Sequence, residues 1–151
     1  MLGVNKKETL ARVFSDAHVL DFDLSKWDKL IAVWVLADHY KEWQDRCPLV
    51  VVDFHGIIDL HMHFNNKNVD LPNDQHVQWI IYKSSIREKD NQIVVNLSGH
   101  LSSPHVDIVC RDITIREVSH TILDSLQPDW NKPFSPLARR SIEELIRQLK
   151  R

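Results

Sequence analysis

Glycine is scarce in this chain. Only Gly3, Gly56 and Gly99 occur among its 151 residues. Loops that bind nucleotide phosphates need several glycines close together, because their backbone must turn tightly and approach the phosphate groups. Three isolated glycines therefore exclude an ATPase of the Walker type and a dinucleotide-binding Rossmann domain.

Cysteine is also rare, and the chain carries no strong net charge. Cys47 and Cys110 have no Cys or His at ligand spacing beside them, which favours two reduced thiols in the cytoplasm, although the sequence leaves open whether they ever pair. Lys and Arg number 19 against 21 Asp and Glu, a formal net charge of −2. This balance gives no overall reason to expect nucleic acid or an anionic membrane as a partner.

Long hydrophobic runs are missing. No run approaches the roughly 18 apolar residues of a membrane-spanning helix, and the first seven residues lack the apolar core of a secretory signal. The composition, 43% hydrophobic and 26% charged, is that of a globular protein, and the length suits one domain with one core. We expect a single cytoplasmic domain over residues 1–151 with no membrane partner.

The first part of the chain predicts a short helix and then a hairpin. Asn5 stands as a helix cap with Glu8 three positions later, and Leu10, Val13 and Phe14 fall on one side. Apolar and acidic residues alternate over 20–24, and the nearly all-apolar run 30–36 follows after a polar turn. We expect two paired strands, the second covered on both faces.

Residues 50–64 keep one period-2 pattern throughout. The even positions carry apolar residues, including Ile58, whereas the odd ones carry Asp53, His55, Asp59, His61 and His63. Gly56 interrupts the run, and a glycine inside a strand commonly marks a bend or bulge. The pattern predicts one long bent strand or two collinear strands.

The remaining segments complete an α+β pattern. After a loop over 65–74 we expect strands over 76–87, apolar on both faces, then over 93–97 and 106–118, with a change of parity near Asp112. Ser135 and Pro136 then begin an amphipathic helix. The sum is a twisted, mostly antiparallel sheet of about six strands in a meander, with a short N-terminal helix and a C-terminal helix packed on one face.

The histidine-rich stretch invites a metal hypothesis. A His-x-His pair on a strand puts both imidazoles on one face, and Ile57-Ile-Asp-Leu-His-Met-His-Phe64 resembles the first-strand motif of amidohydrolases. That family has a complete β/α barrel of about 200 to 400 residues, which this chain is too short to supply. We interpret the stretch as a polar strand face without a cofactor; the alternative is zinc or another divalent metal held by His55, Asp59, His61 and His63.

Other chemistry-bearing residues indicate binding more than catalysis. His100 and His105 flank a serine-containing turn, but no nucleophile elbow is present, so we do not expect an enzyme. Trp27, Trp43 and Trp130 lie in connections, where an aromatic side chain can anchor a protein partner or can cover the core. The last helix is basic, which suits nucleic acid or an acidic partner, or simply outward-pointing side chains; its basic residues are Arg139, Arg140, Arg147, Lys150 and Arg151.

The start of the chain adds a family resemblance. Phe14-Ser-Asp-Ala-His-Val-Leu-Asp-Phe-Asp-Leu24, followed by a hairpin into the run at Leu30, resembles the opening of small bacterial immunity-type proteins. The resemblance implies a non-enzymatic bacterial protein that blocks a partner by surface complementarity. Our hypothesis is therefore a protein-binding domain, such as an immunity protein for a toxin. The alternative is a metal-binding protein or metal-dependent hydrolase that uses the His61 and His63 strand face.

Overall fold

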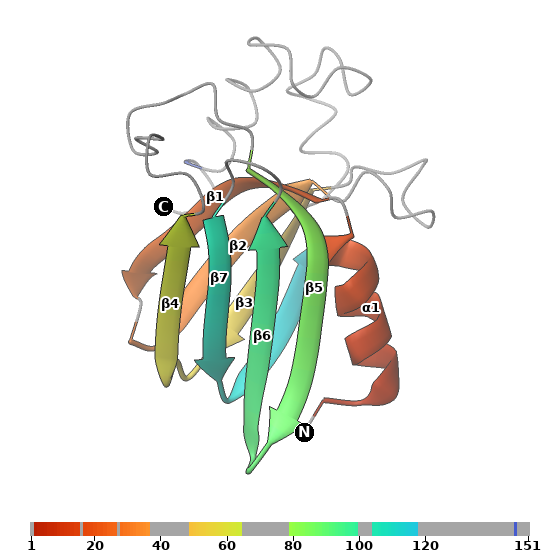
Figure 1. The fold of residues 1–151 in the computed structure, drawn as a ribbon, viewed down its shortest axis with the longest axis vertical. Coiled ribbons are helices and arrows are strands. Elements are labelled where there is room, and N and C mark those ends of the chain that lie inside the picture. Colours follow the sequence, from red (N-terminus) through yellow and green to blue (C-terminus); the bar gives the residue numbers. More distant parts are fainter. Residues whose placement is uncertain are drawn as a thin grey trace, which may run out of the picture.

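The computed structural model describes residues 2–15, 17–26, 28–36, 49–64, 79–99, 104–117 and 147. These residues form one helix and eight strands, all paired antiparallel (Figure 1). The elements are α1 (Val4–Phe14), β1 (Ala17–Lys26), β2 (Leu30–Leu36), β3 (Leu49–His55), β4 (Asp59–Phe64), β5 (Trp79–Lys89), β6 (Gln92–Gly99), β7 (Pro104–Cys110) and β8 (Asp112–Glu117).

Helix α1 supplies one side of the core. It begins at Val4, after Gly3, whose carbonyl accepts the backbone N–H groups of Lys6 and Lys7 at 3.1 Å. The predicted Asn5 cap is wrong, because the backbone turns into the helix before Asn5 and no side chain caps its start. The predicted apolar side is confirmed: its members, Leu10, Val13 and Phe14, are fully buried.

The strand order is β4-β7-β6-β5-β1-β2-β3-β8. The prediction of a mostly antiparallel sheet is confirmed. The prediction of about six strands in a meander is wrong, because the sheet formed by the described residues has eight strands and neighbouring strands are often not consecutive in the chain. β1 lies between β5 and β2, whereas β3 and β4 pair with β8 and β7 instead of with each other. The physical reason is a bend that divides two long stretches of chain into two strands each.

Gly56 and Arg111 form this bend. Gly56 has φ +62°, a left-handed conformation, and leads from β3 into β4. Arg111 leads from β7 into β8, and its N–H donates to the His55 carbonyl at 2.9 Å, while the Ile58 N–H donates to the Val109 carbonyl at 2.8 Å. The two stretches thus stay hydrogen-bonded through the bend, and the predicted change of parity near Asp112 is confirmed.

The curled sheet encloses the core. In Figure 1, β4, β7, β6 and β5 lie in front of β1, β2, β3 and β8, and α1 lies beside β5. Apolar side chains from both groups and from α1 form one buried cluster. Two predicted core residues are exposed instead: Ile58, because the bend turns it outward, and Tyr82, which corrects the expectation that this strand is apolar on both faces.

Strand β2 is buried on both faces, as predicted. Ile31, Val33 and Val35 point into the core cluster, while Ala32 and Trp34 belong to the opposite, outer face and are only 6% and 3% exposed. Covered residues on an outer face are unusual for an antiparallel sheet, whose second face is commonly solvated. This part of the outer face is therefore shielded from solvent.

Some predictions lie outside the described residues. They include the loop over 65–74 and the C-terminal helix, of which only Arg147 is described, as an exposed helical residue. Within the described ranges, no helix is long and apolar enough to cross a membrane.

Candidate binding site

The bend divides the predicted histidine strip into two groups. Asp53 and His55 lie on the outer face of β3, beside β8, where His55 Nε2 is 2.8 Å from Thr114 Oγ1. The other three residues, Asp59, His61 and His63, lie on β4 beside β7. The five residues occupy alternate positions, as the sequence pattern indicates, but the bend separates them, so they do not converge on one point.

The β4 group makes exposed contacts. His61 Nε2 lies 3.0 Å from Asp59 Oδ2, and both side chains are more than half exposed. The rings of His61 and His63 stack with centroids 6.1 Å apart, and His63 Nε2 is 3.8 Å from Asp107 Oδ2 on β7. At exposed positions such pairs contribute little to stability.

Strand β7 adds His105 and Asp107 to this surface. His105 Nδ1 lies 3.1 Å from Ser98 Oγ, and His105 Nε2 lies 3.1 Å from Asp107 Oδ1, which also accepts the Asn96 side-chain amide. Serine, histidine and carboxylate also occur together in acyl-transfer enzymes, but there the serine stands beside backbone N–H groups that stabilise an oxyanion. Ser98 lies inside β6, between β5 and β7, so we interpret this chain of hydrogen bonds as structural.

The metal hypothesis gains no support from this geometry. Among the residues that the structure describes, no group of three or more His, Cys, Asp and Glu side chains is placed to hold a metal ion. The ligand set of His55, Asp59, His61 and His63 stays a prediction.

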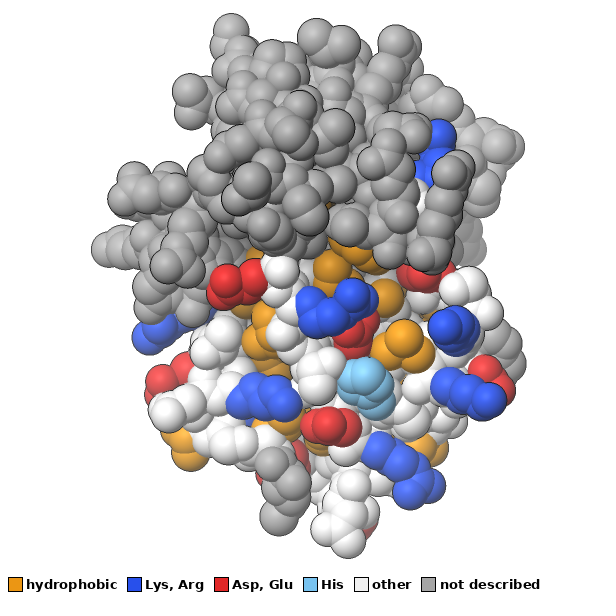
Figure 2. All heavy atoms as spheres, turned by 180° about the vertical axis from the view of Figure 1, so that it is seen from behind, with side chains coloured by type: hydrophobic (Ala, Val, Ile, Leu, Met, Phe, Trp, Pro, Cys, Tyr) orange, Lys and Arg blue, Asp and Glu red, His pale blue; other side chains and the backbone are white. Residues whose placement is uncertain are grey.

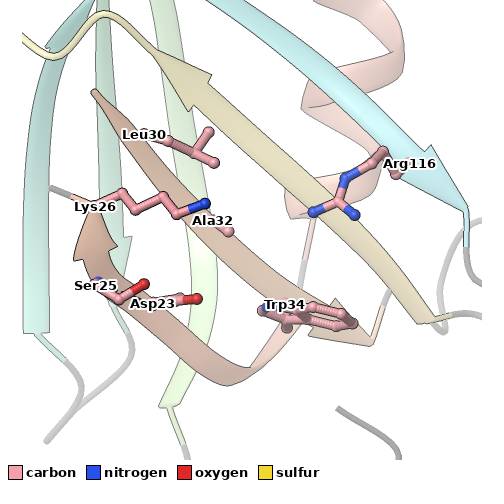
Figure 3. A pocket seen from close by; sticks show the side chains of 7 residues that line it. All are labelled: Asp23, Ser25, Lys26, Leu30, Ala32, Trp34 and Arg116. Atoms are coloured by element: carbon pink, nitrogen blue, oxygen red, sulfur yellow. Dashed lines mark hydrogen bonds between the residues drawn. The ribbon is translucent and has the colours of Figure 1, made fainter. Parts of the chain in front are cut away.

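A pocket of about 380 Å³ lies on the outer face, between the ends of β1 and β2 and the Arg116 side chain of β8 (Figure 3). Basic, acidic and apolar side chains are interspersed over the surface seen in Figure 2. The pocket is lined by Asp23, Ser25, Lys26, Leu30, Ala32, Trp34 and Arg116. The sequence did not predict this pocket. A signal for it was present, because Ala32 and Trp34 occupy the alternate positions of β2 that do not face the core.

An ion pair between a buried carboxylate and a half-exposed guanidinium anchors one side of the pocket. Arg116 donates from Nε to Asp53 Oδ2 at 2.5 Å and from Nη2 to Asp53 Oδ1 at 3.0 Å. The Asp53 side chain is 6% exposed and that of Arg116 is 55% exposed. These hydrogen bonds to Asp53 raise the pKa of Arg116, against the opposing effect of burial. The pair fixes a guanidinium at the pocket wall.

Trp34 forms the floor of the pocket beside this pair. The Arg116 guanidinium carbon lies over its indole at 6.0 Å from the ring centroid, within the range of a cation–π contact. Its Nε1 is buried and has no hydrogen-bond partner among the residues that the structure describes. An unsatisfied buried donor costs about 1–3 kcal/mol, so this position calls for an explanation.

The tryptophans singled out from the sequence, Trp27, Trp43 and Trp130, all lie outside the described residues, as does Cys47. Their predicted roles stay predictions. Cys110 is a free, buried thiol at the end of β7.

Comparison with known proteins gives a likeness in structure but none in sequence family. No family model matches the chain, and no curated protein matches it either. A solved structure, the crystal structure of an uncharacterized protein from Neisseria gonorrhoeae, matches with a TM-score of 0.49 and 8% identity. The match covers 70% of this chain and 94% of that one. The chain is thus similar in structure to an uncharacterised bacterial protein, and this similarity carries no functional information.

Proposed function

We propose that this protein is a non-enzymatic bacterial protein-binding domain, of the kind that blocks a partner as an immunity protein does, and that it engages the partner with the outer face around Trp34. The single observation that carries the proposal is the pocket at this face. It combines a fixed guanidinium, an indole with an unsatisfied donor, and the rim residues Ser25 and Lys26, which are exposed.

The composition of this pocket suits recognition of a protein. Trp and Arg are enriched among the residues that dominate binding energies. In this pocket the half-exposed Arg116 side chain offers the contact area, and the buried Trp34 ring supports it from below. Here the Trp34 indole and the Arg116 guanidinium already contact each other and are held by strands β2 and β8. A surface preorganised in this way loses little entropy when a partner binds.

The proposal is tested with proteins encoded next to this gene, a toxin above all. We expect one of them to form a stable complex with this protein in size-exclusion chromatography. Lys26→Glu reverses the charge at the pocket rim and should weaken the complex at least about tenfold, which is a change of about 1.4 kcal/mol.

Lys83→Glu is the matched control. Lys83 is another exposed lysine on a strand, β5, and it does not line the pocket. The Kd of the complex, measured by calorimetry, should be the same for Lys83→Glu as for the wild type. Equal effects of the two substitutions, or no complex with any neighbouring product, would contradict the proposal.

A further inference from the structure

The pocket between β1, β2 and β8 presents more hydrogen-bond donors than acceptors. Asp53 engages Nε and Nη2 of Arg116, so Nη1 is the part of the guanidinium outside that pair. Within the described residues, Lys26 makes no ion pair. Together with Trp34 Nε1 these groups give three donor positions, against one lining carboxylate, Asp23, whose Oδ1 already accepts the Ser25 N–H at 2.9 Å.

The donors lie around an apolar strip. In Figure 3, Lys26 extends from the end of β1 along β2 toward Ala32, with Leu30 above it, and the Trp34 ring lies farther along β2. The nitrogen end of the Trp34 ring is turned toward the side of the pocket where Asp23 stands. A ligand that fits has an apolar stem for Leu30 and Ala32 and a group of acceptors at its end.

We infer that this pocket binds a carboxylate side chain of a polypeptide partner, with Trp34 Nε1, Lys26 and Arg116 as the donors; the inference rests on the proposed function and names the chemistry of that same site. A carboxylate offers two oxygens in one plane, which suits several N–H donors at once. The formal charges of Lys26 and Arg116 are already balanced by Asp23 and Asp53, so the donors attract the ligand by hydrogen bonds and an anion of low charge is repelled least. A phosphate group, with a charge of about −1.5 to −2 at neutral pH, would face more repulsion from those two carboxylates.

The polypeptide source follows from the form of the site. The pocket opens on the outer face, and its rim residues Ser25 and Lys26 are exposed. A free dicarboxylic acid has few atoms, and binding energy per atom is limited, so such a molecule would bind weakly. A carboxylate carried on a partner gains from contacts that the partner makes around the pocket.

Nuclear magnetic resonance of the indole N–H groups tests the inference directly. The chain has five tryptophans, and the signal missing from Trp34→Phe identifies Trp34. This variant keeps an aromatic ring and removes the donor. The probe is a capped peptide with two adjacent glutamates; the matched control peptide has glutamines in their place.

We expect a saturable shift of the Trp34 signal with the glutamate peptide, at an affinity at least about tenfold higher than with the glutamine peptide. The affinity should fall about tenfold in Trp34→Phe, observed through the backbone signals of β2, and in Lys26→Ala. Lys29→Ala removes the same charge three residues away, outside the pocket lining, and should leave the affinity unchanged.

Three results would overturn the inference: an unmoved Trp34 signal at saturating peptide, equal affinities for the two peptides, or tighter binding of free glutarate than of the glutamate peptide. The backbone spectrum of each variant shows whether it is folded. A partner protein that binds while its complex leaves the Trp34 signal unmoved would refute this inference alone. A carboxylate-binding pocket in a protein that forms no complex with any neighbouring product would refute the proposed function alone.

Discussion

Asp53, Trp34 and Cys110 show three ways in which a buried polar side chain is accommodated in this protein. Asp53 has both carboxylate oxygens bound by Arg116. Trp34 keeps its indole N–H without a partner in the described part of the chain, and Cys110 is a thiol that stays neutral. Asp53 contributes a fixed charge pair, and Cys110 fills space in the core. Trp34 is therefore the one of the three that would gain a hydrogen bond when a ligand binds.

The stability of the protein should depend on pH through Cys110. Its thiol is 0% exposed, and burial, with a further contribution from the Asp112 charge, raises its pKa to about 12. An unfolded chain loses this proton near pH 8.5. The contribution is therefore complete below about pH 8.5 and is lost as the pH rises toward 12, because the unfolded state then binds fewer protons.

The measurement is the free energy of unfolding in urea at pH 7.5 and pH 10, for the wild type and Cys110→Ala. One raised pKa changes this free energy by at most about 1.4 kcal/mol per pH unit. We expect the wild type to lose about 1–2 kcal/mol more than the variant between these two pH values. Equal losses would show that the Cys110 thiol ionises as readily in the folded protein as in the unfolded chain.

Among the elements, the bend between β3 and β4 decides where the polar strips lie. Gly56 adopts φ +62°, and a Cβ atom there would stand 3.0–3.2 Å from the Arg111 side chain. The two long stretches cross the bend together, so β3 stays with β8 and β4 with β7. Without this bend, Asp53 would not form its ion pair with Arg116 on β8.

Substitution of Gly56 by alanine should destabilise the protein by about 2 kcal/mol. The reasons are the left-handed backbone, which costs a residue with a Cβ atom about 1–2 kcal/mol, and the close contact with Arg111. Chemical denaturation gives the value. Gly3→Ala is the control: Gly3 has φ −72° and no heavy atom within 4 Å of an added Cβ, so a loss of about 0.5 kcal/mol is expected there. The explanation fails if both variants lose the same stability.

At the scale of the whole molecule, one helix completes a core that the curled sheet leaves open. Phe14 of α1 stacks on Phe54 of β3 with ring centroids 6.4 Å apart. Ion pairs at 3.8–3.9 Å join Lys7 to Glu88 and Lys6 to Asp112, so α1 contacts both β5 and β8. These surface pairs orient the helix, while its buried side contributes most of the stability.

Phe14→Ala should therefore lower the free energy of unfolding by about 3–5 kcal/mol, the usual cost of removing a fully buried aromatic ring. The matched control is Val4→Ala in the same helix, since Val4 is 73% exposed; we expect a change within about 0.5 kcal/mol. Thermal and urea unfolding of both variants give the two values. A small loss for Phe14→Ala would mean that α1 is not part of the cooperative core.

The sequence by itself determined where α1 and most of the described strand segments lie and which of their positions face inward. Local repeats, which depend only on helix and strand geometry, predicted the α1 stripe, the β1–β2 hairpin, the burial of β2 on both faces and the period-2 face of residues 50–64. The change of parity near Asp112 was readable for the same reason.

The tertiary structure alone decided which strands are neighbours and which outer-face residues meet. The period-2 pattern indicates that Asp53, His61 and His63 share a face. It does not show that the bend places Asp53 beside Arg116 and His63 beside Asp107. The Trp34 pocket has the same origin, because Arg116 on β8 lies far along the chain from Lys26 and Trp34, which belong to the β1–β2 hairpin. Pairing between distant strands depends on the sum of many contacts across the sheet, and no local pattern in the chain records that sum.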